Sequence, residues 1–530
     1  MPRGKVLGGT SALNFLMVSY ATRVDLDNWE KLGNAGWNFD SLAPYYRKFE
    51  RFSQPSAKAA DALHTSHIDP ALHGTQGPIH TTIPESHWPL AETWPPTFKN
   101  LGLGLRGDSK TGTSAGGYSS IAFIDPKTAT RSYSATAYYA PNASRPNLTL
   151  ISDALVTRIT LSGKNTDVVA TGVSFIVDGK GATVKAKKEV ILSAGAFGSP
   201  HILELSGIGS SALLSSHNID VVIANDNVGE NLQDHALVQY SAEVADGELT
   251  MESFRKPEVI QKAMQEYSEH HTGLLATPSI NSSAFIPYIA VLSPTERSQA
   301  AAEIDSTLAE AADLRPGLAK QYELIREGLL SDDETSMQLL FIQAGVPVKK
   351  YAGKIGDRPH PGNYISIASC LQHPFSRGTV HIRSSDPKVY PAVNPRYLSH
   401  SMDLKIFSKH MLHVPKIFTT EPLASHLKGG GTVLQPGYPV LTEENVEMFV
   451  RDNLDTEHHP IATCSMLPRE EGGVVDKELR VYGTTNLRVV DASVLPLQSA
   501  VNTTSTVYAV AERAADLIKE KWGMKLQPSN

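Results

Sequence analysis

Cysteine is scarce in this chain: Cys370 and Cys464 are the two among 530 residues. Two cysteines cannot build a disulfide framework, and whether they pair with each other stays open. Long apolar runs are also lacking, so no membrane span is expected, and the N-terminus has no secretory apolar region. A net charge of -7 argues against the basic face of a nucleic-acid-binding protein. The localisation stays unknown, with secretion open if the natural N-terminus lies upstream of Met1.

The chain is too long for one compact core, and at least two domains are expected. It contains no internal repeat and no low-complexity tract. Asn142, Asn147 and Asn281 begin N-glycosylation sequons, which fit secretion but often arise by chance. None of these features indicates an oligomeric state.

Three motifs suggest other chemistries, and the sequence around each argues against them. Residues 102–107 match G-x-G-x-x-G but follow W-P-P-T-F-K-N instead of a buried strand, which predicts a loop. Residues 112–116 match the hydrolase motif G-x-S-x-G without the apolar strand that must precede it. His64, His67 and His73 have poor helical spacing and no Cys or carboxylate set beside them, so no metal site is expected.

The glycine-rich start of the chain is a candidate cofactor loop. Residues 3–14 read R-G-K-V-L-G-G-T-S-A-L-N. Paired glycines let a backbone approach a ligand closely, and free N–H groups before a helix favour an anion such as pyrophosphate. A plain strand-to-helix turn has the same spacing, so the residues alone leave both interpretations open.

The stretch from 453 to 508 carries the best candidate for catalysis. It contains His458 and His459 before a proline, then an apolar strand that ends in Asp491, then Asn502 before a helical tail. Histidine has an unperturbed pKa near neutrality, which suits proton abstraction, and an Asn amide can hold a substrate oxygen. Taken alone, these residues fit a structural histidine better than a catalytic one.

Local patterns between these ends indicate a mixture of helices and strands. Residues 131–138 predict a capped helix, and residues 147–161 predict paired strands. Residues 187–196 predict a nearly continuous buried parallel strand next to a cofactor. Residues 27–50 form two amphipathic helical pieces, and residues 236–365 turn to charge-rich helical periodicity.

Together, these motifs resemble the glucose-methanol-choline (GMC) flavin oxidoreductases. Residues 3–14 resemble the first signature of the family, with Thr10 in place of the commoner Ser. Residues 195–209 match the second signature at every fixed position, and residues 228–235 match a further block. Residues 373–508 resemble the family through to the C-terminal signature, with glucose-oxidase-like, aryl-alcohol-oxidase-like and choline-dehydrogenase-like features. The resemblance is weak in the helical middle of the chain.

The resemblance implies an α/β fold with an α+β substrate part. The FAD-binding domain is expected to be discontinuous, built from residues 1–65, 145–240 and 455–530. The substrate domain, with an antiparallel sheet and lid or connecting segments, is expected in residues 66–144 and 241–454. Family members normally carry a βαβ unit with G-x-G-x-x-G before the first signature, so this chain is expected to be N-terminally truncated.

The resemblance also implies which residues form the site. His459 is expected to be the general base, Asn502 to orient the substrate oxygen, and His458 to line the substrate pocket. The cofactor is expected to be FAD, which takes a hydride from a small-molecule alcohol and passes electrons to O2 or another acceptor. Its expected contacts are Leu7, Gly9, Thr10, Asn14, Val156, Asp491, Ala492 and Thr503.

Several alternatives remain at this stage. Asp455 stands where glucose oxidases carry an Arg, so glucose is disfavoured, and the alcohol is not identified. Oxidase and dehydrogenase cannot be separated. The chain could instead be a non-redox cyclase or lyase on the same scaffold, or a remnant that cannot hold FAD. Without a βαβ unit, phosphate hydrogen bonds of about 1.5–3 kcal/mol each would be lost, so weak FAD binding and aggregation are expected.

Overall fold

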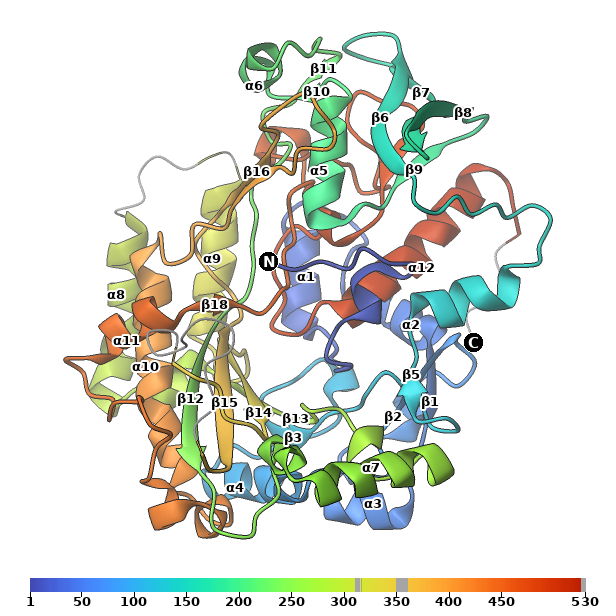
Figure 1. The fold of residues 1–530 in the computed structure, drawn as a ribbon. Helices are drawn as coiled ribbons and strands as arrows, with labels where there is room; N and C mark the ends of the chain where they lie inside the picture. Colours follow the sequence, from blue (N-terminus) through green and yellow to red (C-terminus); the bar gives the residue numbers. More distant parts are fainter. Residues whose placement is uncertain (310–314, 316, 349–360, 526–530) are drawn as a thin grey trace.

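A six-stranded antiparallel sheet forms the largest layer of the molecule (Figure 1). The computed structural model describes residues 1–309, 315, 317–348 and 361–525. The strand order places β12 next to β18, which brings two distant segments together at one edge of the sheet. In spatial order the strands are β18 (Asp455–Thr456), β12 (Ala236–Glu243), β15 (Tyr364–Leu371), β14 (Met337–Ile342), β13 (Ser282–Ile286) and β3 (Gly116–Ser119).

Helices cover this sheet on one side, where α10 (Ser401–Phe418) packs against β15 (Figure 1). Phe407, Met411, Val414 and Phe418 recur at helical spacing along α10 and are fully buried, which explains why this helix lies on the sheet. Other helices of this part are α4 (Trp94–Asn100), α7 (Pro257–His270), α8 (Pro294–Ala309), α9 (Leu318–Leu329) and α11 (Val446–Asn453).

The middle of the chain is less helical than its sequence predicts. Residues 236–365 contain α7, α8 and α9, but they also supply strands of the large sheet. β13 and β14 are buried almost throughout, so they lack the alternation of polar and apolar residues that marks a half-exposed strand. The expected antiparallel sheet is confirmed, and it includes β12 and β18, which begin or lie in segments predicted for the FAD-binding part.

A parallel pair lies in the upper part of the molecule, where β9 (Val190–Leu192) pairs with β19 (Leu487–Val489) (Figure 1). This confirms the predicted parallel strand. Its burial is only partial, because Ile191 is 46% exposed whereas its neighbours on β9 are buried. The chain continues from β9 into α5 (Gly195–Leu205).

The predicted strands and helices near the N-terminal half are largely present. Of the paired strands predicted within residues 147–161, one is present as β6 (Leu155–Ser162). Its partner β7 (Val169–Val177) lies beyond the predicted range, and β8 (Lys180–Lys185) extends the sheet. The helix predicted for residues 131–138 is present but starts later and is not capped: η5 (Ala135–Tyr139) is a helix with wide turns, and it continues into η6 (Ala140–Asn142), which has tight turns. Residues 102–107 form a loop after α4, as predicted.

The N-terminal segment packs against the C-terminal helix. The two predicted helical pieces are α1 (Arg23–Lys31) and α2 (Phe39–Phe49), and α2 packs against α12 (Thr504–Lys521). Trp29 is buried on α1 and donates its Nε1–H to Leu497 O at 3.0 Å, which fixes the segment just before Asn502. Both ends of the chain therefore contribute to the same region.

The remaining elements are short. Cys370 and Cys464 are buried free thiols. Among the described residues, no helix combines the length and apolar character that crossing a membrane requires. The shorter helices and strands are α3 (Ala57–Ala62), α6 (Ser211–Ser216), β1 (Glu50–Ser53), β2 (Ile79–Thr82), β4 (Ile124–Asp125), β5 (Thr130–Arg131), β10 (Ile208–Gly209), β11 (Ile223–Ala224), β16 (Thr379–His381) and β17 (Ala392–Asn394).

Candidate active site

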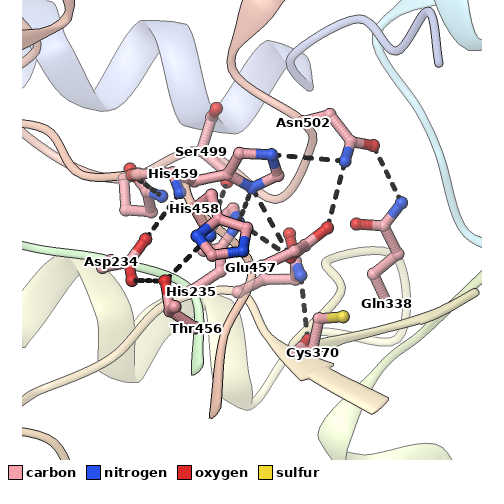
Figure 2. A network of polar contacts seen from close by, with 12 residues as sticks. Asp234, His235, Gln338, Cys370, Thr456, Glu457, His458, His459, Ser499 and Asn502 are labelled. Atoms are coloured by element: carbon pink, nitrogen blue, oxygen red, sulfur yellow. Dashed lines mark hydrogen bonds and ion pairs between the residues drawn. The ribbon is translucent and has the colours of Figure 1, made fainter. Parts of the chain in front are cut away.

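Pairing between β12 and β18 brings Asp234 next to the turn that carries His459. Ala236 pairs with Thr456, so the residues just before β12 face those just after β18. Asp234 Oδ1 accepts the backbone N–H of His459 at 2.7 Å, and its Oδ2 accepts the Thr456 hydroxyl at 2.6 Å. The buried carboxylate of Asp234 thus fixes the backbone of the turn from Thr456 to His459, and with it the position from which the His459 side chain projects (Figure 2).

A second histidine, His235, sets the proton positions on His459. His235 Nε2 lies 3.0 Å from the backbone carbonyl of Ser499, so this nitrogen must carry the proton and donate. In the neutral ring, Nδ1 then has a lone pair, and it lies 3.0 Å from His459 Nδ1. His459 Nδ1 must donate across this contact, which leaves His459 Nε2 as the unprotonated nitrogen.

Glu457 is a buried carboxylate that lies between these groups. Its Oε2 is 3.4 Å from His235 Nδ1 and 3.5 Å from His459 Nδ1, while its Oε1 accepts Asn502 Nδ2–H at 3.0 Å. Burial alone would raise the pKa of Glu457, but the neighbouring His459 and His235 side chains lower it far below its usual range. Glu457 is therefore ionised and can balance a positive charge on His459.

Asn502 meets His459 on the side opposite His235 (Figure 2). Its Oδ1 accepts hydrogen bonds from Gln338 Nε2 at 3.0 Å and from Ser19 Oγ at 3.1 Å, which fixes the orientation of the amide. Its Nδ2 lies 3.5 Å from His459 Nε2. The structure therefore brings together the two residues predicted to be catalytic.

His458 makes no hydrogen bond to His235 or His459 among the described contacts. Its backbone has φ of 65°, its N–H donates to Thr456 Oγ1 at 2.8 Å, and its C=O accepts from Arg3 Nη1 at 2.7 Å. Its Nδ1 is buried and makes no hydrogen bond. Burial lowers the pKa of His458, and the nearby Arg3 charge adds to this effect. Its backbone ties the N-terminal segment to the turn.

The predicted cofactor loop docks on the start of α12. Asn14 Nδ2 donates to Thr504 Oγ1 at 3.3 Å, and Thr10 Oγ1 accepts the backbone N–H of Gly4 at 3.3 Å. Gly9 has φ of 55°, and a Cβ there would meet no atom within 4 Å. Thr503 precedes α12 without a side-chain cap, so this helix N-terminus keeps free N–H groups.

The other predicted cofactor residues lie in two separate places, Asp491 and Ala492 near the start of α5 and Val156 on β6. Asp491 is buried and accepts Gly195 N–H at 2.8 Å and Ser493 N–H at 2.8 Å, so it joins the starts of α5 and of the following turn. Ala492 is half-buried beside it. Val156 lies on β6, in a separate sheet, half-buried against the core.

The residues present fit a large, partly apolar ligand with an anionic group. Leu7, Leu13 and Phe15 are 44%, 59% and 61% exposed, which leaves an apolar surface uncovered on the loop. The open space beside Gly9 would let a ligand come close to the backbone there. The uncapped start of α12 would attract an anionic group. A flavin dinucleotide has both kinds of group.

The histidines considered as metal ligands from the sequence do not assemble. His73 is bound by Glu50 and Asp108 through opposite ring nitrogens, and His64 and His67 contact each other only through the His64 carbonyl. A different group, His235, Glu457 and His459, has ligand atoms that all lie within 4.8 Å of one another.

Sequence reasoning missed two residues of the site, Glu457 and Gln338, and assigned no role to His235. His235 is the last residue of the block 228–235 that resembles the family, and Glu457 lies two residues before His459. These positions in the sequence were the one indication that the two residues could belong to the site. Contacts at the site depend on pairing between distant strands. His235 and His459, for example, are 224 residues apart in the sequence.

Comparison with known proteins gives a consistent result. Residues 1–237 match the GMC oxidoreductase N-terminal family model, and residues 374–511 match the C-terminal one. Dehydrogenase mpl7 of Monascus purpureus is 34% identical over 540 residues, covering 99% of this chain and 84% of the relative. Patulin synthase of Penicillium expansum is 31% identical, covering 97% of this chain and 77% of the relative.

Solved structures agree with these sequence relatives. An FAD-dependent oxidoreductase from Chaetomium thermophilum superimposes with a TM-score of 0.88 at 26% identity, over 99% of this chain and 87% of its own. A fungal aryl-alcohol oxidase gives 0.85 at 26% identity, over 98% and 86%. The predicted fold and oxidoreductase class are confirmed and FAD is supported as the cofactor. The chain belongs to the GMC oxidoreductase family.

Proposed function

We propose that this protein oxidises an alcohol to a carbonyl compound with FAD as the hydride acceptor and His459 as the general base. The observation that carries the proposal is the tautomer of His459: its Nδ1–H is directed to His235, so the lone pair of Nε2 faces Asn502. A base needs this free lone pair within reach of a hydroxyl proton.

The substrate hydroxyl is proposed to contact both His459 Nε2 and Asn502 Nδ2 from one side of the line that joins these nitrogens. One amide N–H of Asn502 is bound to Glu457 Oε1, and the other is available on the side of His459. A hydroxyl can accept this N–H and donate its own proton to Nε2 at the same time. The 3.5 Å separation between the two nitrogens supports this arrangement, because it is longer than a good direct hydrogen bond.

Proton removal and hydride loss are proposed to occur together. FAD, when bound, supplies the hydride acceptor. Transfer of the hydroxyl proton to His459 raises electron density on the carbinol oxygen, which favours departure of the carbinol hydrogen as hydride. Glu457 stabilises the resulting imidazolium, since its carboxylate lies 3.5 Å from His459 Nδ1. Neither a free alkoxide nor a protonated carbonyl then has to form.

The FAD site is proposed to include the loop around Gly9 and the segment from Asp491 to Thr503. Leu7, Gly9, Thr10 and Asn14 would hold the flavin end, together with Asp491, Ala492 and Thr503, and Val156 would contact the adenine end. The bond from Asn14 to Thr504 supports a shared site for the two segments. The division into an FAD part (1–65, 145–240, 455–530) and a substrate part (66–144, 241–454) belongs to the same proposal.

The visible spectrum during anaerobic substrate addition tests the proposal. Protein purified in the presence of FAD should show oxidised flavin absorption, which a reactive alcohol bleaches when O2 is excluded. Primary aliphatic, aromatic and secondary alcohols should be tested in parallel, with readmission of O2 or of a dye to identify the electron acceptor. Conversion of substrate without bleaching would favour a cyclase or lyase, and a protein that takes up no FAD would contradict the proposal.

A further inference from the structure

The group formed by His235, Glu457 and His459 has the composition of a metal site. We propose that these three side chains bind one Zn²⁺ ion, and that bound Zn²⁺ reversibly inhibits the enzyme. The inhibition rests on the proposed function, because it acts on the base His459, whereas the metal site depends only on the three side chains. Two imidazoles and one carboxylate are a donor set that zinc accepts in proteins.

The separations of the donor atoms fit a tetrahedral ion. His235 Nδ1 and His459 Nδ1 are 3.0 Å apart, and Glu457 Oε2 lies 3.4 Å and 3.5 Å from them. Ligands bound to Zn²⁺ at about 2.05 Å in tetrahedral geometry are separated by about 3.3 Å. A point about 2.05 Å from all three donors lies about 0.7 Å out of their plane, as in a three-ligand zinc site.

Glu457 Oε2 provides independent support for a cation. This oxygen is buried and makes no hydrogen bond, although Oε1 of the same carboxylate accepts the Asn502 amide. The Glu457 side chain is 5% exposed, so bulk solvent has little access to this oxygen. A buried carboxylate oxygen without a donor is costly, and a metal ion would satisfy it.

The surroundings hold the donors in position. His235 Nε2–H donates to the Ser499 carbonyl, which is the kind of outer contact that orients a metal-ligating imidazole and leaves Nδ1 unprotonated. His459 is held by its backbone bond to Asp234, and Glu457 by Asn502. Of the three side chains, His459 is the most exposed, at 13%, whereas His235 is fully buried.

His73 and His381, two other described histidines that each contact two carboxylates, lack this geometry. His73 bonds Glu50 and Asp108 from opposite sides of its ring, and His381 bonds two carboxylates in the same way. Such rings bridge two partners and cannot join them around one ion. Over the described part of the chain, the group at His459 is the one set of three donors that converges within 4.8 Å.

Binding of Zn²⁺ would remove the proposed base. His459 Nδ1 carries a proton in the metal-free arrangement and must give it up to bind the ion. In a neutral imidazole the proton then resides on Nε2, the atom that otherwise accepts the substrate proton. Zinc therefore inhibits by changing the tautomer, even where the substrate still fits.

Direct metal titration of the full chain in the presence of FAD tests the site. Isothermal titration with Zn²⁺ should give one ion per chain, and Co²⁺ should give the intense visible bands of a tetrahedral ion. Glu457→Gln keeps the size and the Asn502 contact but should weaken Zn²⁺ by more than about 100-fold, since outer-shell changes alone cost about 10–100-fold. His235→Gln is the second ligand variant, and His270→Gln, at an exposed histidine, is the control.

The outcomes separate the two proposals. Binding that is lost in both ligand variants and retained in His270→Gln supports the site. The site is excluded if Zn²⁺ fails to saturate at one ion per chain, or if Glu457→Gln binds it as tightly as the unmodified protein. If inhibition occurs as proposed, bound Zn²⁺ lowers the rate of alcohol oxidation and a chelator restores it. Zn²⁺ binding with an unchanged rate would overturn the proposed inhibition. Absence of alcohol oxidation in metal-free protein would contradict the proposed function and leave the titration result standing.

Discussion

His235 Nδ1 and His459 Nδ1 lie 3.0 Å apart, although 224 residues separate them in the sequence. Because the N–H proton of the neutral His235 ring lies on Nε2 and is donated to Ser499 O, the hydrogen bond runs from His459 Nδ1–H to His235 Nδ1. This direction leaves His459 Nε2 free beside Asn502. The proposed base is thus oriented by a residue that needs no contact with the substrate.

Glu457→Gln should lower the rate of alcohol oxidation by about 10²-fold, the lower end of what a general base contributes. The substitution keeps the shape of the side chain but removes the charge that stabilises protonated His459 at 3.5 Å. The rate of anaerobic flavin reduction measures this effect without the electron-acceptor step. Glu470→Gln, at an exposed carboxylate, is the control. An unchanged reduction rate in Glu457→Gln would show that its charge has no role.

Asn502→Ala should reduce activity less than His459→Ala but should cost more stability. Gln338 and Ser19 lose their acceptor and Glu457 loses a donor, each bond being worth about 0.5–1.5 kcal/mol. The free energy of unfolding should therefore fall by about 2–4 kcal/mol in urea titrations. The proposed division of roles fails if Asn502→Ala is as inactive as His459→Ala and equally stable as the unmodified protein.

Gly9→Ala should weaken FAD binding by more than about tenfold, a cost of about 1.4 kcal/mol or more. Gly9 has φ of 55°, and its open side is where the proposed cofactor approaches the backbone. Gly102→Ala is a matched control, since Gly102 has φ of 75° and equally open space but lies in the loop after α4. Fluorescence titration with FAD compares the two variants. Equal effects of both would place the cofactor elsewhere.

Acid should destabilise the protein through Glu50, a buried carboxylate paired with Lys110 and His73. Burial alone would raise its pKa, but these two partners lower the pKa of Glu50 from 4.5 to about 2. A lowered pKa contributes stability that is complete above pH 4.5 and is lost as the pH falls towards 2, about 3 kcal/mol in all. Urea unfolding over this pH range should show a weaker pH dependence in Glu50→Gln, whereas Glu258→Gln, at an exposed site, should match the unmodified protein.

The sequence predicted the local features of the site better than its contacts. The turn at His459 and the position of Asn502 before a helix follow from short motifs, and the structure places them 3.5 Å apart. Glu457 was not singled out, because a carboxylate two residues from a histidine has no meaning until β12 pairs with β18. Single-chain patterns do not specify which distant strands pair.

The helix predicted for residues 131–138 is shifted and irregular in the structure, where long-range contacts hold its first residues. Ser134 Oγ donates to Gly8 O at 3.0 Å and lies 2.8 Å from Ser11 Oγ, so this segment is held by the N-terminal loop. The segment is helical from Ala135, with wide turns in η5 and tight turns in η6 instead of regular α-helical turns. Helical propensity is a weak preference, and a few long-range hydrogen bonds are enough to change the conformation.

The anaerobic reduction rate of the flavin in His459→Ala, measured beside His458→Ala, tests the central claim most directly. We predict that His459→Ala slows reduction by an alcohol by about 10²–10⁴-fold while FAD remains bound, because a general base contributes this much. His458→Ala should stay within about tenfold of the unmodified protein, since His458 makes no contact with Asn502 or His235 among the described interactions. A silent His459→Ala together with an inactive His458→Ala would contradict the account.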